Sequence, residues 1–479
     1  MLFNSIEFAL FFPIVCCLYF AAPLRFRVPL LLAASCVFYM AFIPAYILIL
    51  FLTIGVDYIA GIYIERTQGA KRRAWLIGSI VSTCAILFVF KYYNFFVGGF
   101  TSGAELLGWE IPDAHWNIIL PIGLSFHTFQ SLSYVVEVYR GRQTAEYNFL
   151  TYATYVMFFP QLVAGPIERP QNLLHQFREV HPFDYDRVTS GLKRMALGFF
   201  KKLVVADRLA LYVNDVYGSP QSHNGLQLTL ATFFFAYQIY CDFSGYSDIA
   251  IGTARVLGFR LMENFHTPYH SLSVSEFWRR WHISLSTWFK DYVYVPLGGS
   301  RVTKPRWMLN VLLTFGISGL WHGANWTYVL WGLLNGTYLI CGEMSRNLRN
   351  RFFSLFGLTE ATLPRRGIML VSTFVLTCAA WILFRARTMG DAQYIFSHFF
   401  TNWNFSVIKT QQFHLKHFPA AIGAILLLEA IQLARPRFPL PVIVSRMPGV
   451  VRWAAYAGFM FIVILFGVFR SGEFIYFQF

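Results

Sequence analysis

The residues best suited to chemistry in this chain are two histidines that stand among aromatic residues. His282 lies in the stretch FWRRWHISLSTWFK, and His322 lies in GLWHGANWTYVLWG, between a tryptophan and a glycine. A neutral imidazole accepts a proton near pH 7, so a buried histidine is a suitable base for activating a hydroxyl group. The sequence has neither a GxSxG elbow nor a cysteine-centred motif that would indicate a covalent enzyme intermediate. If the chemistry is an acyl transfer, direct attack of an acceptor hydroxyl on a thioester is therefore the economical mechanism.

The segment around His282 is predicted to be a short helix. Ser273 and Glu276 match the S-x-x-E capping box, which places the first helical residue near Val274. The helix can run to about Lys290, before the turn signal PLGG. Such a helix is about 24 Å long, which is short for a membrane crossing. We therefore expect it to lie in the membrane interface or to dip into it, and a simple interfacial anchor with snorkelling arginines is the alternative.

Spacing along this helix separates the polar residues into two groups. A repeat of four places three residues on one face: Trp278, His282 and Ser286. The cations point elsewhere and could bind the phosphates of a cytoplasmic thioester donor: Arg279, Arg280 and Lys290, followed by Arg301 and Lys304. The general excess of basic residues in cytoplasmic loops explains the same cations without any ligand.

The segment around His322 is predicted to contain a break. The apolar stretch 307–341 would be about 52 Å long as one helix, too long for a single span. We expect two short helices that meet around Gly319–Asn325, with His322 at the break. Non-helical backbone at membrane depth is tolerated only where it is buried in protein or lines a cavity, which favours a functional histidine. A structural histidine on an apolar face is the alternative.

Two aspartates lie within a third apolar segment, YQIYCDFSGYSDIAIG. Asp242 and Asp248 could orient a histidine or pair with an arginine. Helix packing, with Ser244 and Gly245 at a close contact, is the alternative explanation. Two further polar residues near Gly and Pro breaks are weaker candidates for lining a cavity: His127 and Gln161.

Composition identifies a membrane protein. The 479 residues are 56% hydrophobic and only 13% charged, and the mean hydropathy is +0.48, whereas soluble chains carry roughly 25% charge. We predict one polytopic all-α membrane domain over residues 1–479 with about 11 to 13 membrane segments. The net charge of +15 is explained by basic cytoplasmic loops rather than by nucleic-acid binding. The seven cysteines show no CxxC spacing, so neither a metal site nor a disulfide framework is predicted.

The predicted segments and their orientation follow from apolar runs and basic loops. Segment 4–22 lacks the basic start of a cleavable signal peptide and is expected to be a retained span. Basic clusters after the first and third spans, and before the last spans, place these loops in the cytoplasm and both termini outside. Besides the two histidine segments, the predicted spans are 4–22, 28–44, 46–64, 74–97, 116–138, 148–165, 192–216, 226–256, 367–386, 418–434 and 450–470.

Four motifs in order resemble one family. FWRRWHISLSTWFKDYVYVPLGGSR, GLWHGANWTYVLWGLLNG, CDFSGYSDIAIG and the terminal FIYFQF are similar to the membrane-bound O-acyltransferase family, most of all to its bacterial polysaccharide branch. The resemblance runs from MLFNSIEFALFFP to the last residue. It implies a ring of tilted helices around a funnel or tunnel, with short re-entrant or interfacial helices.

The resemblance also implies roles for residues. His322 would be the catalytic base, and His282 a second active-site residue on the donor side of the funnel. The residues expected to line the donor side or the tunnel are Trp278, Arg279, Arg280, Trp281, Ser286, Lys290, Asp242, Trp321 and Asn325.

The implied reaction takes place at the bacterial cytoplasmic membrane. An acetyl group would pass from cytoplasmic acetyl-CoA, or from an acyl carrier protein as in related D-alanylation proteins, to an extracytoplasmic polysaccharide such as alginate. The resemblance implies an extracytoplasmic SGNH-hydrolase-like partner, membrane lipids around the protein, and a thioester substrate with no bound cofactor.

The C-terminal FIYFQF and the overall function leave several interpretations open. Tyr476 could carry the acyl group transiently, and an aromatic belt at the membrane interface is the alternative. A transporter or lipid flippase would also have broken helices and polar groups near the midplane, although no inverted repeat is visible. A membrane haem protein with paired histidines, or a non-catalytic subunit of a polysaccharide export complex, would also be polytopic.

Overall fold

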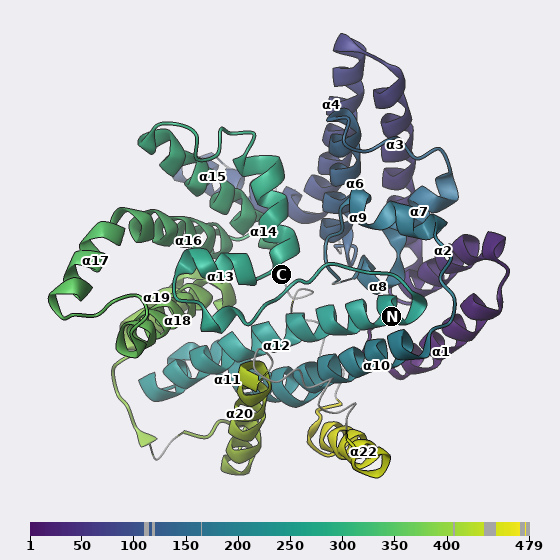
Figure 1. Ribbon diagram of the computed structural model, residues 1–479. Coiled ribbons are helices and arrows are strands. Elements are labelled where there is room, and N and C mark those ends of the chain that lie inside the picture. Colours follow the sequence, from purple (N-terminus) through teal and green to yellow (C-terminus); the bar gives the residue numbers. More distant parts are fainter. Residues whose placement is uncertain are drawn as a thin grey trace. The chain divides into compact units, whose positions relative to one another are not determined.

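The computed structural model describes residues 1–109, 115–116, 120–163, 165–405, 408–434, 447–469 and 475. These residues form an all-α protein, as predicted, and Figure 1 shows its helices. The contacts divide the chain into two compact units. Unit 1 comprises Met1–Met195 and Ser247–Glu263, and unit 2 comprises Ala196–Tyr246 and Asn264–Phe479. The single domain over 1–479 stays a prediction.

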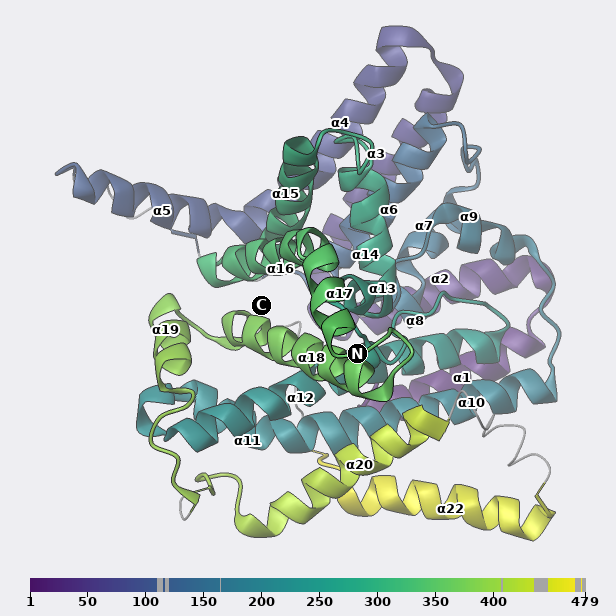
Figure 2. The same ribbon diagram turned by 60° about the vertical axis from the view of Figure 1, so that its left-hand side comes forward.

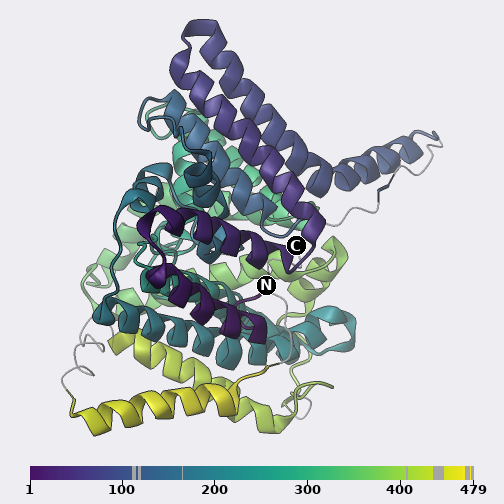
Figure 3. The same cartoon turned by 90° about the vertical axis from the view of Figure 1, so that its right-hand side faces the viewer.

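Unit 1 is a set of packed apolar helices. The hairpin of α3 and α4, side by side in Figure 3, is joined by polar contacts: the Ser79 hydroxyl donates to the Asp57 carboxylate at 2.6 Å, and Thr83 donates to it at 3.2 Å. These bonds satisfy a carboxylate that is fully buried. The helices are α1 (Ile6–Ala21), α2 (Leu24–Met40), α3 (Ile47–Arg66), α4 (Gly69–Leu87), α5 (Tyr93–Leu106), α6 (Leu124–Tyr139), α7 (Phe149–Met157), α8 (Phe159–Leu162) and α9 (Pro170–Leu173).

Two long elements contribute residues to both units, and the remaining helices belong to unit 2. The shared elements are α10 (Tyr185–Phe199) and α12 (Gly225–Leu257). Within unit 2, α15 and α16 lie against each other (Figure 2). The helices of unit 2 are the π-helix η4 (Phe200–Ala206), α11 (Asp207–Gly218), α13 (Val274–Arg280), α14 (Ile283–Phe289), the π-helix η7 (Lys290–Tyr294), α15 (Lys304–His322), α16 (Trp326–Met344), α17 (Arg346–Leu355), α18 (Leu363–Arg385), α19 (Met389–His398), α20 (Phe418–Ala434) and α22 (Gly449–Phe466).

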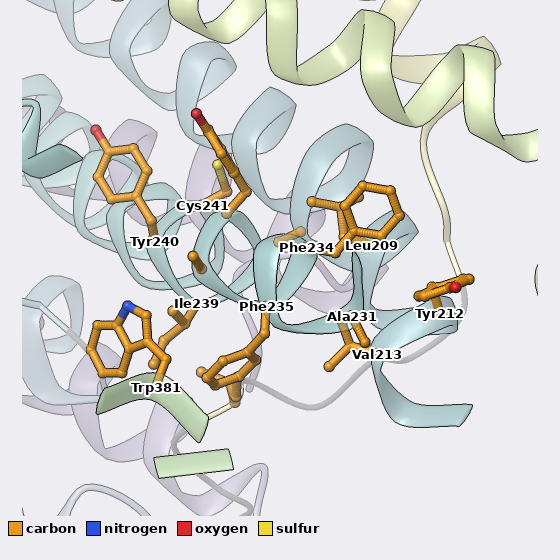
Figure 4. Close-up of a cluster of buried hydrophobic side chains, with 14 of the residues drawn as sticks. Leu209, Tyr212, Val213, Ala231, Phe234, Phe235, Ile239, Tyr240, Cys241 and Trp381 are labelled. Carbon is orange, nitrogen blue, oxygen red and sulfur yellow. The ribbon is translucent and has the colours of Figure 1, made fainter. Parts of the chain in front are cut away.

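The core of unit 2 is rich in aromatic residues. Figure 4 shows Leu209 and Val213 of α11 beside Phe234 and Phe235 of α12, with Trp381 of α18 at the edge of the cluster. All five side chains are at least 98% buried. Burial of one large apolar side chain contributes about 1.5–3 kcal/mol. This core fixes α12, which packs on the His282 segment, and α18, which contacts both histidine segments.

Five helical stretches in the described part of the chain are long and apolar enough to cross a membrane, so the protein is a multi-pass membrane protein. They account for five of the 11 to 13 predicted segments by length and composition. The five stretches are Pro44–Arg66, Gly69–Leu106, Leu363–Arg385, Leu415–Ala434 and Gly449–Phe466.

Most predicted spans match helices within a few residues, and the differences occur at Pro, Asn and wide turns. The apolar run 148–165 is not one span, because Asn148 caps α7 and the chain turns before Pro160 to start α8. The run 116–138 yields a helix only from Leu124, after Gly123 in a left-handed conformation. The run 192–216 is divided among α10, the π-helix η4 and α11.

Glycines allow α15 and α16 to pack backbone against backbone. A Cβ atom on Gly332 would lie 2.1 Å from the Phe315 carbonyl oxygen, whereas a Cβ on Gly342 of the same helix would meet nothing within 4 Å. We therefore expect Gly332→Ala to lower the free energy of unfolding by about 1–3 kcal/mol through overpacking. Gly342→Ala should leave stability unchanged or raise it, since alanine favours helices. Thermal unfolding of the two variants in detergent checks this, and equal melting temperatures would contradict it.

Candidate active site

The predicted break around His322 is present. Helix α15 ends at His322, and Gly323 is extended with φ −164° and ψ 148°. Asn325 then caps α16: its side-chain oxygen accepts the Thr327 N–H at 3.0 Å, and its amide nitrogen donates to the Arg387 carbonyl at 3.2 Å. Asn325 thus holds the three-residue connection in place at the end of α18.

The two helices are not short, which corrects the prediction. Helix α15 begins at Lys304 and α16 continues to Met344, and each has 19 residues. Each helix is therefore about 28 Å long, close to the thickness of a bilayer core. The polar start of α15, KPR at 304–306, was excluded from the apolar stretch although it is helical.

Aromatic rings enclose His322. The imidazole is 4% exposed. It meets the ring of Trp331 edge to face at 5.0 Å between centroids, and it contacts Phe384 at 5.3 Å and Trp321 at 4.9 Å. These walls shield the ring from bulk water and fix its orientation. The site is suited to a proton transfer from which solvent is excluded.

The predicted capping box before His282 is confirmed, but the helix is interrupted. Ser273 Oγ accepts the Glu276 N–H at 3.1 Å, and α13 begins at Val274. However, α13 ends at Arg280, and His282 has φ +43° in the left-handed region before α14 begins. Trp278, His282 and Ser286 therefore do not share one helical face. A non-glycine residue with positive φ costs about 1–2 kcal/mol and persists only where its surroundings hold it.

Asn264 holds His282 in this conformation. Its Oδ1 accepts the Ser284 backbone N–H at 3.2 Å and the Ser284 hydroxyl at 2.9 Å. A backbone N–H is only a donor, so the Asn264 oxygen must face this group. His282 Nδ1 lies 3.1 Å from the same oxygen and therefore carries the hydrogen. The lone pair is then on Nε2, the tautomer that can accept a proton there.

Asn264 was missed by the sequence analysis. It lies 18 residues before His282, in a segment without a recognisable motif. A polar residue in ENFHTPY, just after an apolar helix, gives no signal that it bonds to a histidine beyond the next turn. The strain at His282 was equally invisible, because non-glycine residues rarely adopt positive φ.

Four tryptophans join the two histidine segments within unit 2. The rings of Trp278 and Trp331 lie 5.7 Å apart, those of Trp281 and Trp381 lie 5.1 Å apart, and Trp331 stacks on Trp381 at 5.9 Å. Since Trp331 also contacts His322, the residues around both histidines form one continuous aromatic cluster. The structure thus brings Trp278, Trp281, Trp321 and His322 into one set of ring contacts, and their role in one active site stays a prediction.

The predicted cations differ in their availability. Arg280 pairs with Glu276 at 2.6 Å, one helical turn away. Arg279 and Lys290 are exposed. The Ser286 hydroxyl donates to the Trp281 carbonyl at 3.1 Å and so closes the first turn of α14. Arg279 and Lys290 are thus better placed than Arg280 to meet an anionic ligand.

The partners of the two aspartates were predicted only in part. Asp248 pairs with an arginine, Arg194 of unit 1, at 2.9 Å. Asp242 instead pairs with Lys202 at 2.5 Å, and this lysine was not identified from the sequence. The close contact at Gly245 is confirmed, because a Cβ there would lie 2.8 Å from the Gly198 carbonyl oxygen.

Three predicted residues lie elsewhere. Tyr476 is outside the residues that the structure describes. His127 and Gln161 line one narrow pocket in unit 1, where His127 Nε2 lies 2.5 Å from the Thr53 hydroxyl. They therefore have a buried polar environment of their own.

Removal of the Asn264 acceptor is expected to destabilise the His282 turn. Asn264→Leu leaves the Ser284 N–H and the imidazole N–H buried without their acceptor, which costs about 1–3 kcal/mol for each group. Asn264→Asp keeps an oxygen in the same place and should retain most of the stability. Thermal unfolding of the two variants tests the difference. An Asn264→Leu variant as stable as the wild type would contradict the assigned role.

Comparison with known proteins identifies related chains. Residues 79–384 match the sequence model of the membrane-bound O-acyltransferase family. The probable alginate O-acetylase AlgI of Azotobacter vinelandii is 40% identical over 86% of this chain and 81% of its own length. The protein of the same name from Pseudomonas aeruginosa is 39% identical over 85% of this chain and 76% of its own. The peptidoglycan O-acetyltransferase of Helicobacter pylori is 33% identical, covering 76% and 71%.

Proposed function

Since the chain belongs to the membrane-bound O-acyltransferase family and is an O-acyltransferase, we propose that it passes an acetyl group across the membrane for O-acetylation of an extracytoplasmic polysaccharide. The observation that supports this most is the pair of buried histidines, each at a helix break and joined by one aromatic cluster in unit 2. Such a site combines proton acceptors with exclusion of water, the two requirements of hydroxyl attack on a thioester.

In the proposed reaction, His322 is the base. Its imidazole takes the proton of an acceptor hydroxyl while the hydroxyl oxygen attacks the carbonyl carbon of the acetyl thioester. The carbon–sulfur bond then breaks, and the imidazolium passes its proton to the leaving thiolate, which gives the free thiol and restores His322 as the base. His282, with its lone pair on Nε2, serves the donor side as a hydrogen-bond or proton acceptor. The tryptophans between the two histidines keep bulk water from hydrolysing the thioester.

The donor is proposed to be cytoplasmic acetyl-CoA. Arg279 and Lys290 are exposed cations near the His282 turn, and charged side chains of this kind bind phosphates. Trp278, Trp281 and Ser286 would form the adjoining wall, with Trp321 and Asn325 at the His322 end and Asp242 on α12. An acyl carrier protein, whose prosthetic group also presents a thioester, is the alternative donor.

The acceptor side is proposed to be extracytoplasmic. The named relatives act on alginate and on peptidoglycan, which supports a polysaccharide acceptor for this chain. We place both chain termini outside the cytoplasmic membrane and propose an SGNH-hydrolase-like partner that completes the transfer. Tyr476 is the proposed transient carrier of the acetyl group, and Tyr476→Phe keeps the ring while removing the hydroxyl. Full polymer acetylation in that variant would rule out the relay.

Release of free CoA thiol tests the proposal. The purified protein is incubated with acetyl-CoA labelled in the acetyl group, together with membranes that contain the partner and the polymer. The expected result is thiol release with transfer of the label to the polymer. Uptake of a substrate into vesicles without thiol release would replace the acyltransferase with a transporter. Release from an acetylated carrier protein alone would retain the reaction and change the donor.

A further inference from the structure

A lysine lies between two aspartates in the core of unit 2, and the proposed chemistry does not use it. Lys202 Nζ is 2.5 Å from Asp242 Oδ1 and 2.9 Å from Asp207 Oδ1. The three side chains are 1%, 3% and 9% exposed. Apolar residues of similar volume are often as stabilising as buried ions, so stability alone does not account for this cluster.

The backbone around this cluster allows α12 to approach the π-helix η4 closely. Lys202 lies in the π-helix η4, a wide form of helix that occurs often at functional sites. Asp207 is the first residue of α11, and Asp242 lies in α12. Gly245 follows Asp242 by about one turn, and a Cβ on it would lie 3.1 Å from the backbone nitrogen of Lys202. The absent side chain thus lets α12 bring Asp242 onto the π-helix.

The other partner of Asp242 comes from the end of the chain. The Ile475 N–H donates to Asp242 Oδ2 at 2.7 Å, and Ile475 is 2% exposed within the same apolar core. Two contacts at the end of α22 reach the same region: the Val468 N–H donates to the Leu203 carbonyl at 3.0 Å, and Arg208 donates to the Phe466 carbonyl. These three hydrogen bonds join Phe466, Val468 and Ile475 to α11, η4 and α12, respectively.

The same turn of α12 also contacts the candidate active site. Phe243, next to Asp242, meets the His282 ring edge to face at 4.5 Å. Tyr240 contacts Trp281 at 6.2 Å between ring centroids. One turn of α12 thus links the end of the chain to the strained His282 turn.

We propose that Asp242, paired with Lys202, is a positioning residue that holds the C-terminal segment at Ile475 beside the turn of α12 that packs on His282. Lys202 occupies one carboxylate oxygen and orients the other toward the Ile475 N–H. Asp207 pairs with the same lysine, whereas the Ile475 N–H donates to Asp242. The functional consequence rests on the proposed acyl transfer: release of the segment disturbs turnover although no reacting group is removed.

Two matched substitutions distinguish the hydrogen bond from Ile475 to Asp242, called the anchor below, from the charge cluster of Lys202, Asp207 and Asp242. Asp242→Asn and Asp207→Asn each remove one negative charge and leave Lys202 with one carboxylate. An asparagine at 242 must direct its oxygen toward Lys202, so its amide N–H groups face the Ile475 N–H and donor opposes donor. We expect amide hydrogen exchange in the C-terminal peptide that contains Ile475 to become at least about tenfold faster in Asp242→Asn, and to change less than about twofold in Asp207→Asn.

A second pair of variants, at position 475, leaves the charge cluster intact. It tests the anchor even if the aspartate variants do not fold. Ile475→Pro removes the N–H donor, fixes φ and replaces the buried side chain, whereas Ile475→Val keeps the donor and a β-branched side chain. Faster exchange around position 475 in the proline variant alone supports the anchor. Equal exchange in Ile475→Pro and Ile475→Val, or equal effects of Asp242→Asn and Asp207→Asn, overturns it.

Turnover is measured on the same full-length proteins. The anchor predicts that Asp242→Asn and Ile475→Pro lower thiol release at least about fivefold, while their controls stay within about twofold. Amide hydrogen exchange does not depend on enzymatic activity. The anchor and the proposed acyl transfer can therefore be refuted independently of each other. Selective exchange with no thiol release in any protein, wild type included, retains the anchor and removes the proposed function. Normal turnover in variants with faster exchange at Ile475 would show that the anchor has no effect on the reaction.

Discussion

His322→Gln is expected to lower acetyl-CoA turnover by about 10²- to 10⁴-fold, the usual contribution of a general base. Glutamine approximates the length of histidine and keeps polar atoms near the ring position, but it cannot take a proton near pH 7. The imidazole lies among Trp331, Phe384 and Trp321, and no charged residue is among these ring contacts. The loss should therefore appear in kcat rather than in the KM for the donor.

Free thiol release by the purified protein measures this effect. His175→Gln is a matched control, since its imidazole is 58% exposed and lies in unit 1. It should retain full turnover. Equal turnover in the wild type and His322→Gln would remove His322 from the chemistry. If neither protein acts on acetyl-CoA alone, the comparison is repeated with acetylated carrier protein and with the partner membranes, where the same ratio is expected.

Local sequence signals predicted the position of the helix break at His322 and of one helix start. Ser273 and Glu276 gave the first residue of α13, because a capping box acts through neighbouring residues only. The glycines and Asn325 gave the connection between α15 and α16 for the same reason. Apolar runs likewise gave most helices of both units, since hydrophobic length is a local property of a chain.

Features that depend on distant residues could not be predicted. The left-handed turn at His282 exists because Asn264, from the preceding loop, supplies an acceptor for Ser284 and for the imidazole. Nothing between Ser273 and Lys290 reveals this partner, so the segment was predicted as one continuous helix. Lys202 was missed because two adjacent lysines in an apolar run, FFKKLVVA, resemble snorkelling residues. Its two carboxylate partners come from the next helix and from α12.

His282→Asn is expected to lower turnover by about 10²-fold or more while leaving the fold intact. Asparagine tolerates the left-handed region better than most residues, so the turn at φ +43° should persist. The substitution removes the imidazole, and with it the lone pair on Nε2 that we assign to the donor side. Ser284 still donates to Asn264, which preserves the connection between the loop and α14.

A comparison with His282→Ala separates the chemistry from the backbone. Alanine also lacks the imidazole, and it offers no polar atom that could bond to Asn264 or favour the left-handed conformation. His282→Ala should therefore lose turnover and about 0.5–1.5 kcal/mol of stability, because the hydrogen bond to Asn264 is not replaced, whereas the polar side chain in His282→Asn should keep most of the stability. Thermal unfolding and thiol release, measured on both variants, separate the two effects. Full turnover in His282→Asn would show that this histidine serves only the shape of the turn, and the donor side of the site would then have to be assigned to different residues.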